Sequence, residues 1–510
     1  MSDRSERLFA ALTQISDRHI EEAAQPPEKQ AHPWRKWGTA AACVTLIAVT
    51  ASIFPHLGGC GASMGDSAAP EAEEGYTEFL SYAGPILPLT LETPNDALTA
   101  ERTVTLDFAP WVPRWEEEGD LSIFPEGGRW RWEEDLLVED SYLLTNTGTT
   151  PQTVTVQLPF VSSLEGLQVD APMLEAEGQS LSTELLAGKP APAYDYTDWQ
   201  DCADQLSDGT VRQKAATPLL ADQHVPVTVY AFTEPWAEKQ DAKRVPNPTV
   251  QVRFDLDFEK TQVLTYGFDG GSNNWEEGRM CREFSIPDGR RPREPEARLL
   301  LIFGEPVRNL ETSCHSTGGS DPDTPILEEA GVTVTRHDAN LMNVLWWLLE
   351  DWDWQWPLGE DLDADTLYRL LLQQLDMDFS RGPEEINRRG GMLEDSLMQL
   401  HSAQRVLWTT AQLTIPAGET LTLTAHSRKE PSYNYGGTGD TARKGYDLLP
   451  WLDTSLTFTG QTAVLNTRDR VEPVDQNFGF DPAGGVNAVS LSPEVEHYYL
   501  EVVPLPWEEP

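Results

Sequence analysis

The sequence predicts a mainly β protein, in which an immunoglobulin-like β-sandwich with a helical insertion follows one N-terminal transmembrane helix. Three observations support this prediction. Residues 38–54 form an uncharged, mostly apolar run. Beyond residue 100, apolar and polar residues alternate with the period of two that is typical of half-buried strands. Between residues 338 and 408, the alternation gives way to the longer period of helices.

The apolar run indicates a membrane span over residues 38–57. A helix through residues 38–54 is roughly 25 Å long at about 1.5 Å per residue, near the thickness of a hydrocarbon core. Arg35 and Lys36 precede it, and the next basic residue is Arg102. The positive-inside rule therefore predicts a single-pass protein of the cell membrane, with a cytoplasmic N-terminus and an extracellular C-terminal domain. The alternative is a buried core helix of a soluble protein.

A second alternative concerns Cys60. The sequence Leu57-Gly58-Gly59-Cys60 resembles a lipobox, in which the cysteine is lipidated and the preceding segment is removed. The long N-terminal extension favours an uncleaved anchor instead. Either outcome places most of the chain on the outer face of a membrane.

Charge and cysteine content limit the classes of partner. The formal net charge of −46 opposes binding to nucleic acid, because an acidic surface repels phosphate. Of the five cysteines, only Cys202, Cys281 and Cys314 lie beyond Cys60. Three thiols cannot form a fully paired framework, although one bridge with one free thiol remains open.

Residues 1–37 predict a short cytoplasmic helix, over 4–24, and a proline-containing joint. The string LFAALTQISDRHIEEAA, the joint and WRKWGTAAACVTLIAV resemble the leaders of uncharacterised single-pass surface proteins of Gram-positive anaerobes. Some proteins of similar layout are membrane-bound regulators of extracytoplasmic-function sigma factors. That resemblance, limited to about the first sixty residues, implies a cytoplasmic protein partner. The cysteines of the zinc-binding anti-sigma pattern are absent from the cytoplasmic part.

The sequence beyond residue 57 predicts six segments. Residues 58–100, rich in Gly, Ala, Ser, Pro and Glu, indicate a flexible spacer. Strands on both sides of the turn TNTGTTPQ indicate a β-sandwich region over 101–195. A proline-containing linker over about 186–219 leads to a second β region, 220–325, which contains the alternating strand 250–258. A helical insertion over 326–410, with its last helix at 383–408, precedes a C-terminal β region, 411–510.

One cluster of residues is a candidate ligand site. Tryptophan rings stack on sugar rings and carboxylates bind sugar hydroxyls, so a mixed cluster of both suits a glycan cleft. The candidate residues are Trp352, Trp354, Trp356, Asp351 and Asp353. The alternative is a helix that buries its tryptophans in the core, which the spacing of Trp346 and Trp347 after Leu341 and Val344 favours.

Other motifs do not predict an enzyme. Asp361, Asp363 and Asp365 begin like a calcium loop, but Thr366 occupies the required glycine position. The G-x-S-x-G string at 61–65 lies in the predicted spacer, without a strand before it or a helix after it. No cofactor motif, catalytic residue or metal site is predicted.

The sequence therefore favours a membrane-anchored, acidic extracytoplasmic binding or sensing protein, with an extracellular protein or glycan as its ligand. Two alternatives remain: an anti-sigma-like regulator that acts through its cytoplasmic helix, and a carbohydrate-active enzyme of the cell surface.

Overall fold

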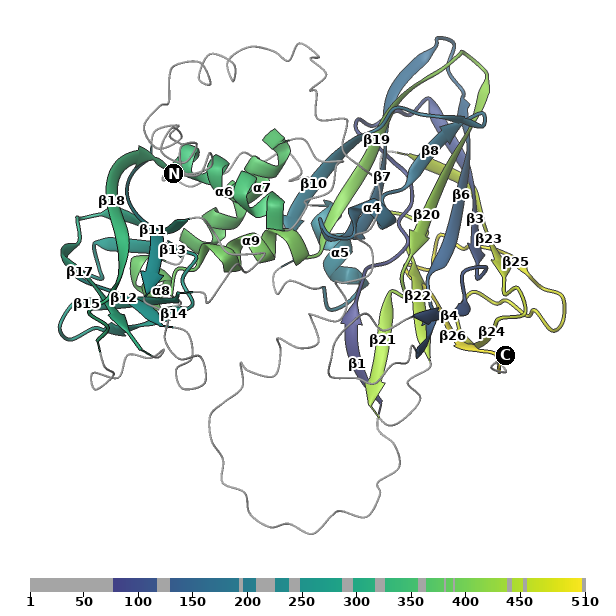
Figure 1. The fold of residues 1–510 in the computed structure, drawn as a ribbon. Helices are drawn as coiled ribbons and strands as arrows, with labels where there is room; N and C mark the ends of the chain where they lie inside the picture. Colours follow the sequence, from purple (N-terminus) through teal and green to yellow (C-terminus); the bar gives the residue numbers. More distant parts are fainter. Residues whose placement is uncertain are drawn as a thin grey trace.

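The computed structural model describes residues 77–116, 129–191, 196–207, 225–237, 248–286, 297–316, 326–355, 364–379, 382–388, 390–437, 443–452 and 456–506. They form two β-rich lobes with a group of helices between them (Figure 1). The predicted mainly β class is confirmed, whereas the immunoglobulin-like assignment stays a prediction. No helix in these ranges is long and apolar enough to cross a membrane. The predicted span 38–57, the cytoplasmic helix and Cys60 lie outside the described residues.

The first lobe is built on a seven-stranded sheet, which we call the long sheet. Its strands, in spatial order, are β25 (Ala488–Ser490), β23 (Thr457–Asn466), β3 (Leu98–Asp107), β6 (Leu136–Asn146), β20 (Thr420–Lys429), β8 (Met173–Ala176) and β9 (Gln179–Ser180). All neighbouring pairs are antiparallel except β23 and β3. One face of the long sheet is packed against two smaller sheets, so the lobe is a layered β structure.

Each smaller sheet covers a different part of the long sheet. The first covering sheet contains β10 (Glu184–Pro190), β19 (Arg405–Ile415), β7 (Gln152–Ser162) and β2 (Thr90–Leu91). The second contains β1 (Thr77–Tyr82), β21 (Tyr433–Gly437), β22 (Lys444–Leu448), β26 (Tyr498–Pro504) and β24 (Val471–Gln476). A separate hairpin joins β4 (Val112–Glu116) to β5 (Arg129–Glu133). Two apolar cores result, one under each covering sheet.

The predicted strands around TNTGTTPQ are confirmed as β6 and β7, which lie in different sheets on opposite sides of one core. Asn146 holds this corner. Its buried side-chain amide donates to the carbonyls of Thr150, Ile415 and Pro416 at 2.9 to 3.0 Å, and its oxygen accepts from the amide of Gly148 at 2.9 Å.

The second lobe is inserted between β10 and β19, which pair with each other. Its inner sheet contains β13 (Thr261–Tyr266), β16 (Ala297–Gly304), β11 (Pro226–Ala237) and β18 (Ala330–Asn340). Its outer sheet contains β14 (Gly270–Asn274), β15 (Arg279–Ser285), β12 (Thr249–Asp255) and β17 (Arg308–His315). The predicted buried run 299–303 lies in β16, which is a central strand and is buried on both faces.

Helices cover the other face of the inner sheet. They are α6 (Leu341–Gln355), α7 (Ala364–Phe379), α8 (Pro383–Arg388) and α9 (Leu393–Ser402). Their apolar residues join the inner sheet and side chains of the first covering sheet, such as Phe160 and Leu407, in one core. Two short helices, α4 (Leu167–Asp170) and α5 (Trp199–Ser207), belong to the first lobe. The helices therefore connect the lobes through buried apolar contacts (Figure 1).

Three predictions from the sequence were wrong in part. The predicted spacer 58–100 contains β1, β2 and the start of β3, and its apolar residues Leu87 and Leu89 are buried. The predicted linker, 186–219, contains the last part of β10 and all of α5. Strand β10 was missed because it gains its hydrogen bonds from β19, more than 200 residues away. The last predicted helix ends at Ser402, and residues 405–408 begin β19 instead.

Candidate functional site

The predicted tryptophan cluster lies on α6, and the structure describes part of it. Trp346 stacks on Tyr368 of α7, with ring centroids 4.7 Å apart. Trp347 meets Tyr266 of β13 edge to face, at 6.0 Å. Both rings pack against the core under the helices, as the core interpretation of these two residues requires.

The candidate ligand residues themselves are only partly described. Asp351, Trp352, Asp353 and Trp354 lie in the last turns of α6, but their side chains are outside the described part of the structure. Trp356 lies wholly outside it. The glycan-cleft hypothesis for these residues therefore stays a prediction.

Metal ligation and thiol chemistry find little support among the described residues. Among the described residues, no group of three or more His, Cys, Asp or Glu side chains is arranged to hold a metal ion. Cys202, Cys281 and Cys314 are buried free thiols. Burial raises the pKa of Cys202, which is the opposite of what a nucleophilic thiol needs.

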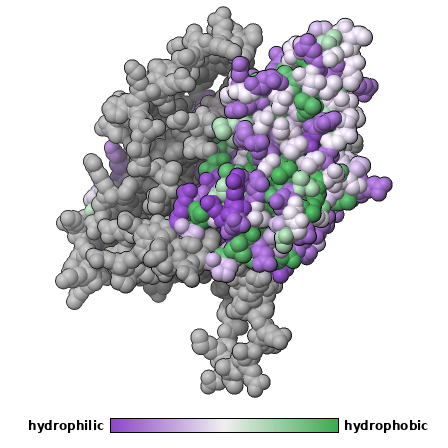
Figure 2. Space-filling model, turned by 90° about the vertical axis from the view of Figure 1, so that its right-hand side faces the viewer, coloured by the Kyte–Doolittle hydropathy of each residue, from purple (hydrophilic) through white to green (hydrophobic). Residues whose placement is uncertain are grey.

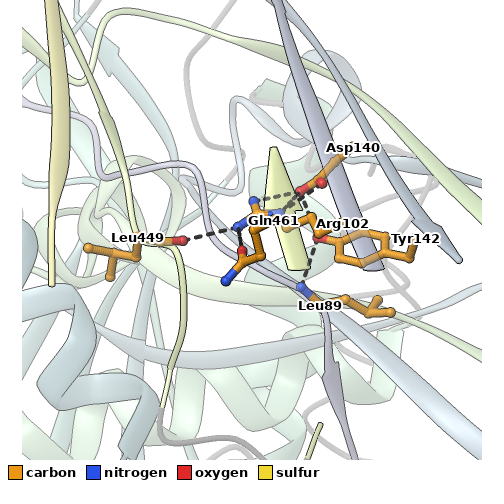
Figure 3. Close-up of polar contacts among 6 residues, drawn as sticks. All are labelled: Leu89, Arg102, Asp140, Tyr142, Leu449 and Gln461. Carbon is orange, nitrogen blue, oxygen red and sulfur yellow. Dashed lines mark hydrogen bonds and ion pairs between the residues drawn. The ribbon is translucent and has the colours of Figure 1, made fainter. Parts of the chain in front are cut away.

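The first lobe contains a buried ion pair with several further hydrogen-bond partners (Figure 3). Arg102 of β3 donates from Nε to Asp140 Oδ1 at 2.9 Å and from Nη2 to Oδ2 at 2.7 Å. Tyr142 donates its hydroxyl to the same Oδ2 at 2.6 Å. All three side chains are almost fully buried. The carboxylate therefore receives strong, charge-assisted hydrogen bonds away from water.

This ion pair connects the long sheet to both covering sheets. Arg102 Nη1 donates to the carbonyl of Leu449, just after β22, at 3.2 Å. The amide of Leu89, just before β2, donates to the Tyr142 hydroxyl at 2.9 Å. Figure 3 shows Arg102, Asp140 and Tyr142 together, with Leu449 on one side of them, Leu89 below, and Gln461 of β23 beside Arg102. We call Arg102, Asp140, Tyr142, Leu89 and Leu449 the three-sheet joint.

The charge state of the joint follows from its geometry. Burial alone would lower the pKa of Arg102, but Asp140 and Tyr142 beside it raise that pKa overall. Burial also raises the pKa of Tyr142, so its hydroxyl stays a hydrogen-bond donor. The joint is a closed, satisfied network that fixes sheets in place.

A small cavity of about 40 Å³ adjoins the joint, with Asp140, Asp170 and Lys429 in its lining. Burial raises the pKa of Asp170 to about 6, although its hydrogen bond from Ser162 at 2.7 Å acts in the opposite direction. Burial lowers the pKa of Lys429, which donates to the carbonyl oxygens of Ala83 and Glu430 at 2.9 and 3.1 Å. A cavity of this size has room for a few water molecules.

The other face of the long sheet, which we call the outer face, carries side chains that do not face either core. Its central strands are in register, so their outward residues form rows across the sheet. One row is Thr457, Thr99, Thr145 and Thr420. Another is Thr462, Thr103, Ser141, Thr424 and Glu175. Figure 2 shows this side of the molecule, where hydrophobic, near-neutral and hydrophilic residues are interspersed.

Large apolar side chains stand among these hydroxyls. Leu143 and Leu137 of β6 are 42% and 41% exposed, and Met173 of β8 is 64% exposed. Among the described residues, these three are the exposed large apolar side chains of the long sheet. The alternation in β6 and β20 is the sequence signal for this face, but it does not reveal which strands lie side by side.

No protein-family model, curated protein or solved structure matches the chain.

Proposed function

We propose that this protein is a membrane-anchored, extracytoplasmic binding protein, and that the outer face of the long sheet is its binding surface. The proposed anchor is the apolar run 38–57, with its basic flank in the cytoplasm. The two lobes then lie outside the cell. The single observation that carries the binding role is the composition of the outer face.

The outer face combines properties that a binding surface needs. The strands of the long sheet are held by backbone ladders on both sides, so the outward side chains occupy fixed positions. Hydroxyl groups lie close to one another across neighbouring strands, as for Thr145 and Thr420, whose oxygens are 3.3 Å apart. Leu137, Leu143 and Met173 add apolar area that a ligand would bury.

A variant that blocks the centre of the face tests the proposal. Thr103 is exposed, with Thr462 and Ser141 as its neighbours across the sheet. Thr103→Trp places a large ring there without changing charge. The full chain, in lipid nanodiscs, would be applied to immobilised neutral glycans, anionic glycans, cationic peptides and anionic peptides. We expect binding to one of these classes, and at least about tenfold weaker binding by the variant, or about 1.4 kcal/mol.

The matched control is Thr153→Trp. Thr153 is also an exposed threonine on a strand of the first lobe, but it lies in the first covering sheet. This control is expected to bind like the unmodified chain. Equal binding by Thr103→Trp and Thr153→Trp, or no binding of any class by the unmodified chain, would contradict the proposal.

A further inference from the structure

We infer that the ligand of the outer face is a cationic polypeptide segment that also carries apolar side chains. This inference rests on the proposed function, because it names the partner of the same surface. It follows from the charges and the apolar residues on that face, together with the ion pairs that neutralise its one arginine, Arg428.

The outward positions of β3, β6, β20 and β8 carry more acids than bases. The acids are Glu101, Asp107, Glu139 and Glu175, and the one arginine is Arg428. Arg428 forms ion pairs with Glu133 and Asp135, so its charge is already neutralised. Asp107 is likewise paired, at 2.5 Å, with Arg468.

Among the described residues, the other three carboxylates of these strands have no lysine or arginine partner. Glu101 is exposed and forms no ion pair with any residue that the structure describes. Glu139 and Glu175 lie on either side of His426, at 4.0 and 3.9 Å from its ring nitrogens. The three carboxylates therefore present negative charge on a face whose one arginine is already paired, and a positively charged partner is the electrostatic complement.

The exposed apolar residues of the outer face imply that the partner carries apolar side chains as well as positive charge. Leu137 and Glu139 are two residues apart on β6, or about 7 Å, and Leu143 lies a further four residues along the same strand, about 13 Å. Met173 is the register partner of His426 on the neighbouring strand. Carboxylates and apolar side chains thus alternate over distances that one polypeptide segment spans. Lysine or arginine would meet the carboxylates while apolar side chains meet the leucines.

The test uses the full chain in zwitterionic nanodiscs and a fluorescent, lysine-rich peptide that also carries leucines. The variant is Glu101→Gln with Glu139→Gln and Glu175→Gln, which keeps the shape of each side chain. We expect it to bind the peptide at least about tenfold more weakly than the unmodified chain, since each exposed pair contributes modestly. We also expect the affinity of the unmodified chain to fall as salt is added.

A matched control separates this face from the general acidity of the chain. Glu259→Gln with Glu328→Gln and Glu329→Gln removes three exposed carboxylates from the second lobe and changes the net charge by the same amount. It is expected to change peptide affinity by less than about twofold. A third variant, Leu143→Ser with Met173→Ser, is expected to weaken binding about tenfold through lost apolar burial.

The outcomes distinguish the inference from the proposed function. If the two carboxylate variants weaken binding equally, or if peptides with serine or glutamate in place of lysine bind as tightly, the inference is wrong. The proposed function would still stand if Thr103→Trp abolished binding of another ligand class. Unchanged melting temperatures of all variants would show that a loss of affinity does not reflect unfolding.

Discussion

At the scale of single residues, the three-sheet joint stabilises the packing of the long sheet against its two covering sheets. Arg102 is a buried cation with one carboxylate partner, Asp140. Removing a charge from water is costly, and the ion pair offsets that cost only while both partners are present. This ion pair could not be predicted from the sequence. Arg102 and Asp140 lie in alternating strands, where a charged residue is normally expected on the exposed face.

Asp140→Asn should therefore be strongly destabilising. It leaves the Arg102 guanidinium buried without an opposite charge, which typically costs about 3–5 kcal/mol. The double variant Arg102→Met with Asp140→Leu should lose much less, because apolar groups then replace both charges. Urea unfolding would measure both effects. Equal destabilisation of the single and double variants would contradict this account of the joint.

At the scale of elements, α8, α9 and the residues between them cover the edge of the inner sheet at β13. The edge strand β13 offers backbone N–H groups at Val263, Thr265 and the following Gly267. They donate to the Asn387 side chain at 3.1 Å, to the Gly391 carbonyl at 2.7 Å, and to the Glu394 carboxylate. These groups satisfy the edge as a neighbouring strand would, which removes a site of aggregation.

Glu394 should make stability depend on pH. Burial raises its pKa to about 7 from an ordinary value of 4.5, although the hydrogen bond from Gly267 acts in the opposite direction. The folded protein therefore retains this proton at pH values where the unfolded chain has lost it. Its contribution to the free energy of unfolding falls as pH rises from about 4.5 to about 7, and then levels off.

Glu394→Gln should remove this dependence. The amide still accepts from Gly267 but does not ionise, so the variant should match the unmodified chain near pH 4. Above pH 7 it should be more stable by about 3 kcal/mol. Thermal unfolding across this pH range measures the difference, with Glu259→Gln as an exposed control. A constant difference at all pH values would contradict the assignment.

Elements were predictable where their patterns are local. The alternation of 250–258 predicted β12, and the run 299–303 predicted β16. In both strands, the apolar residues that form the pattern are buried. Strand β10 was missed because its pairing with β19 is distant in sequence. The outer face was missed for the same reason. Threonines such as Thr99 and Thr420 become neighbours of β6 only through sheet order.

At the scale of the whole molecule, the second lobe is an insertion in the first lobe, between β10 and β19. After β10 and α5, the chain forms the inner and outer sheets and the helices α6 to α9, and it then re-enters the first lobe at β19, which pairs with β10. The predicted helical insertion 326–410 contains the helices α6 to α9, but its bounds were wrong, because it begins with β18 and ends within β19. The core under the helices contains apolar residues of both lobes, so the second lobe packs directly against the first.

The central claim is that residues 38–57 anchor the chain and leave both lobes outside the cell. Antibody labelling of intact cells that express the full chain, tagged at one end or the other, tests it most directly. We expect the C-terminal tag to be readable on intact cells and the N-terminal tag only after permeabilisation, with the protein in the membrane fraction. An N-terminal tag readable from outside, or full-length protein free in solution after lysis, would contradict the account.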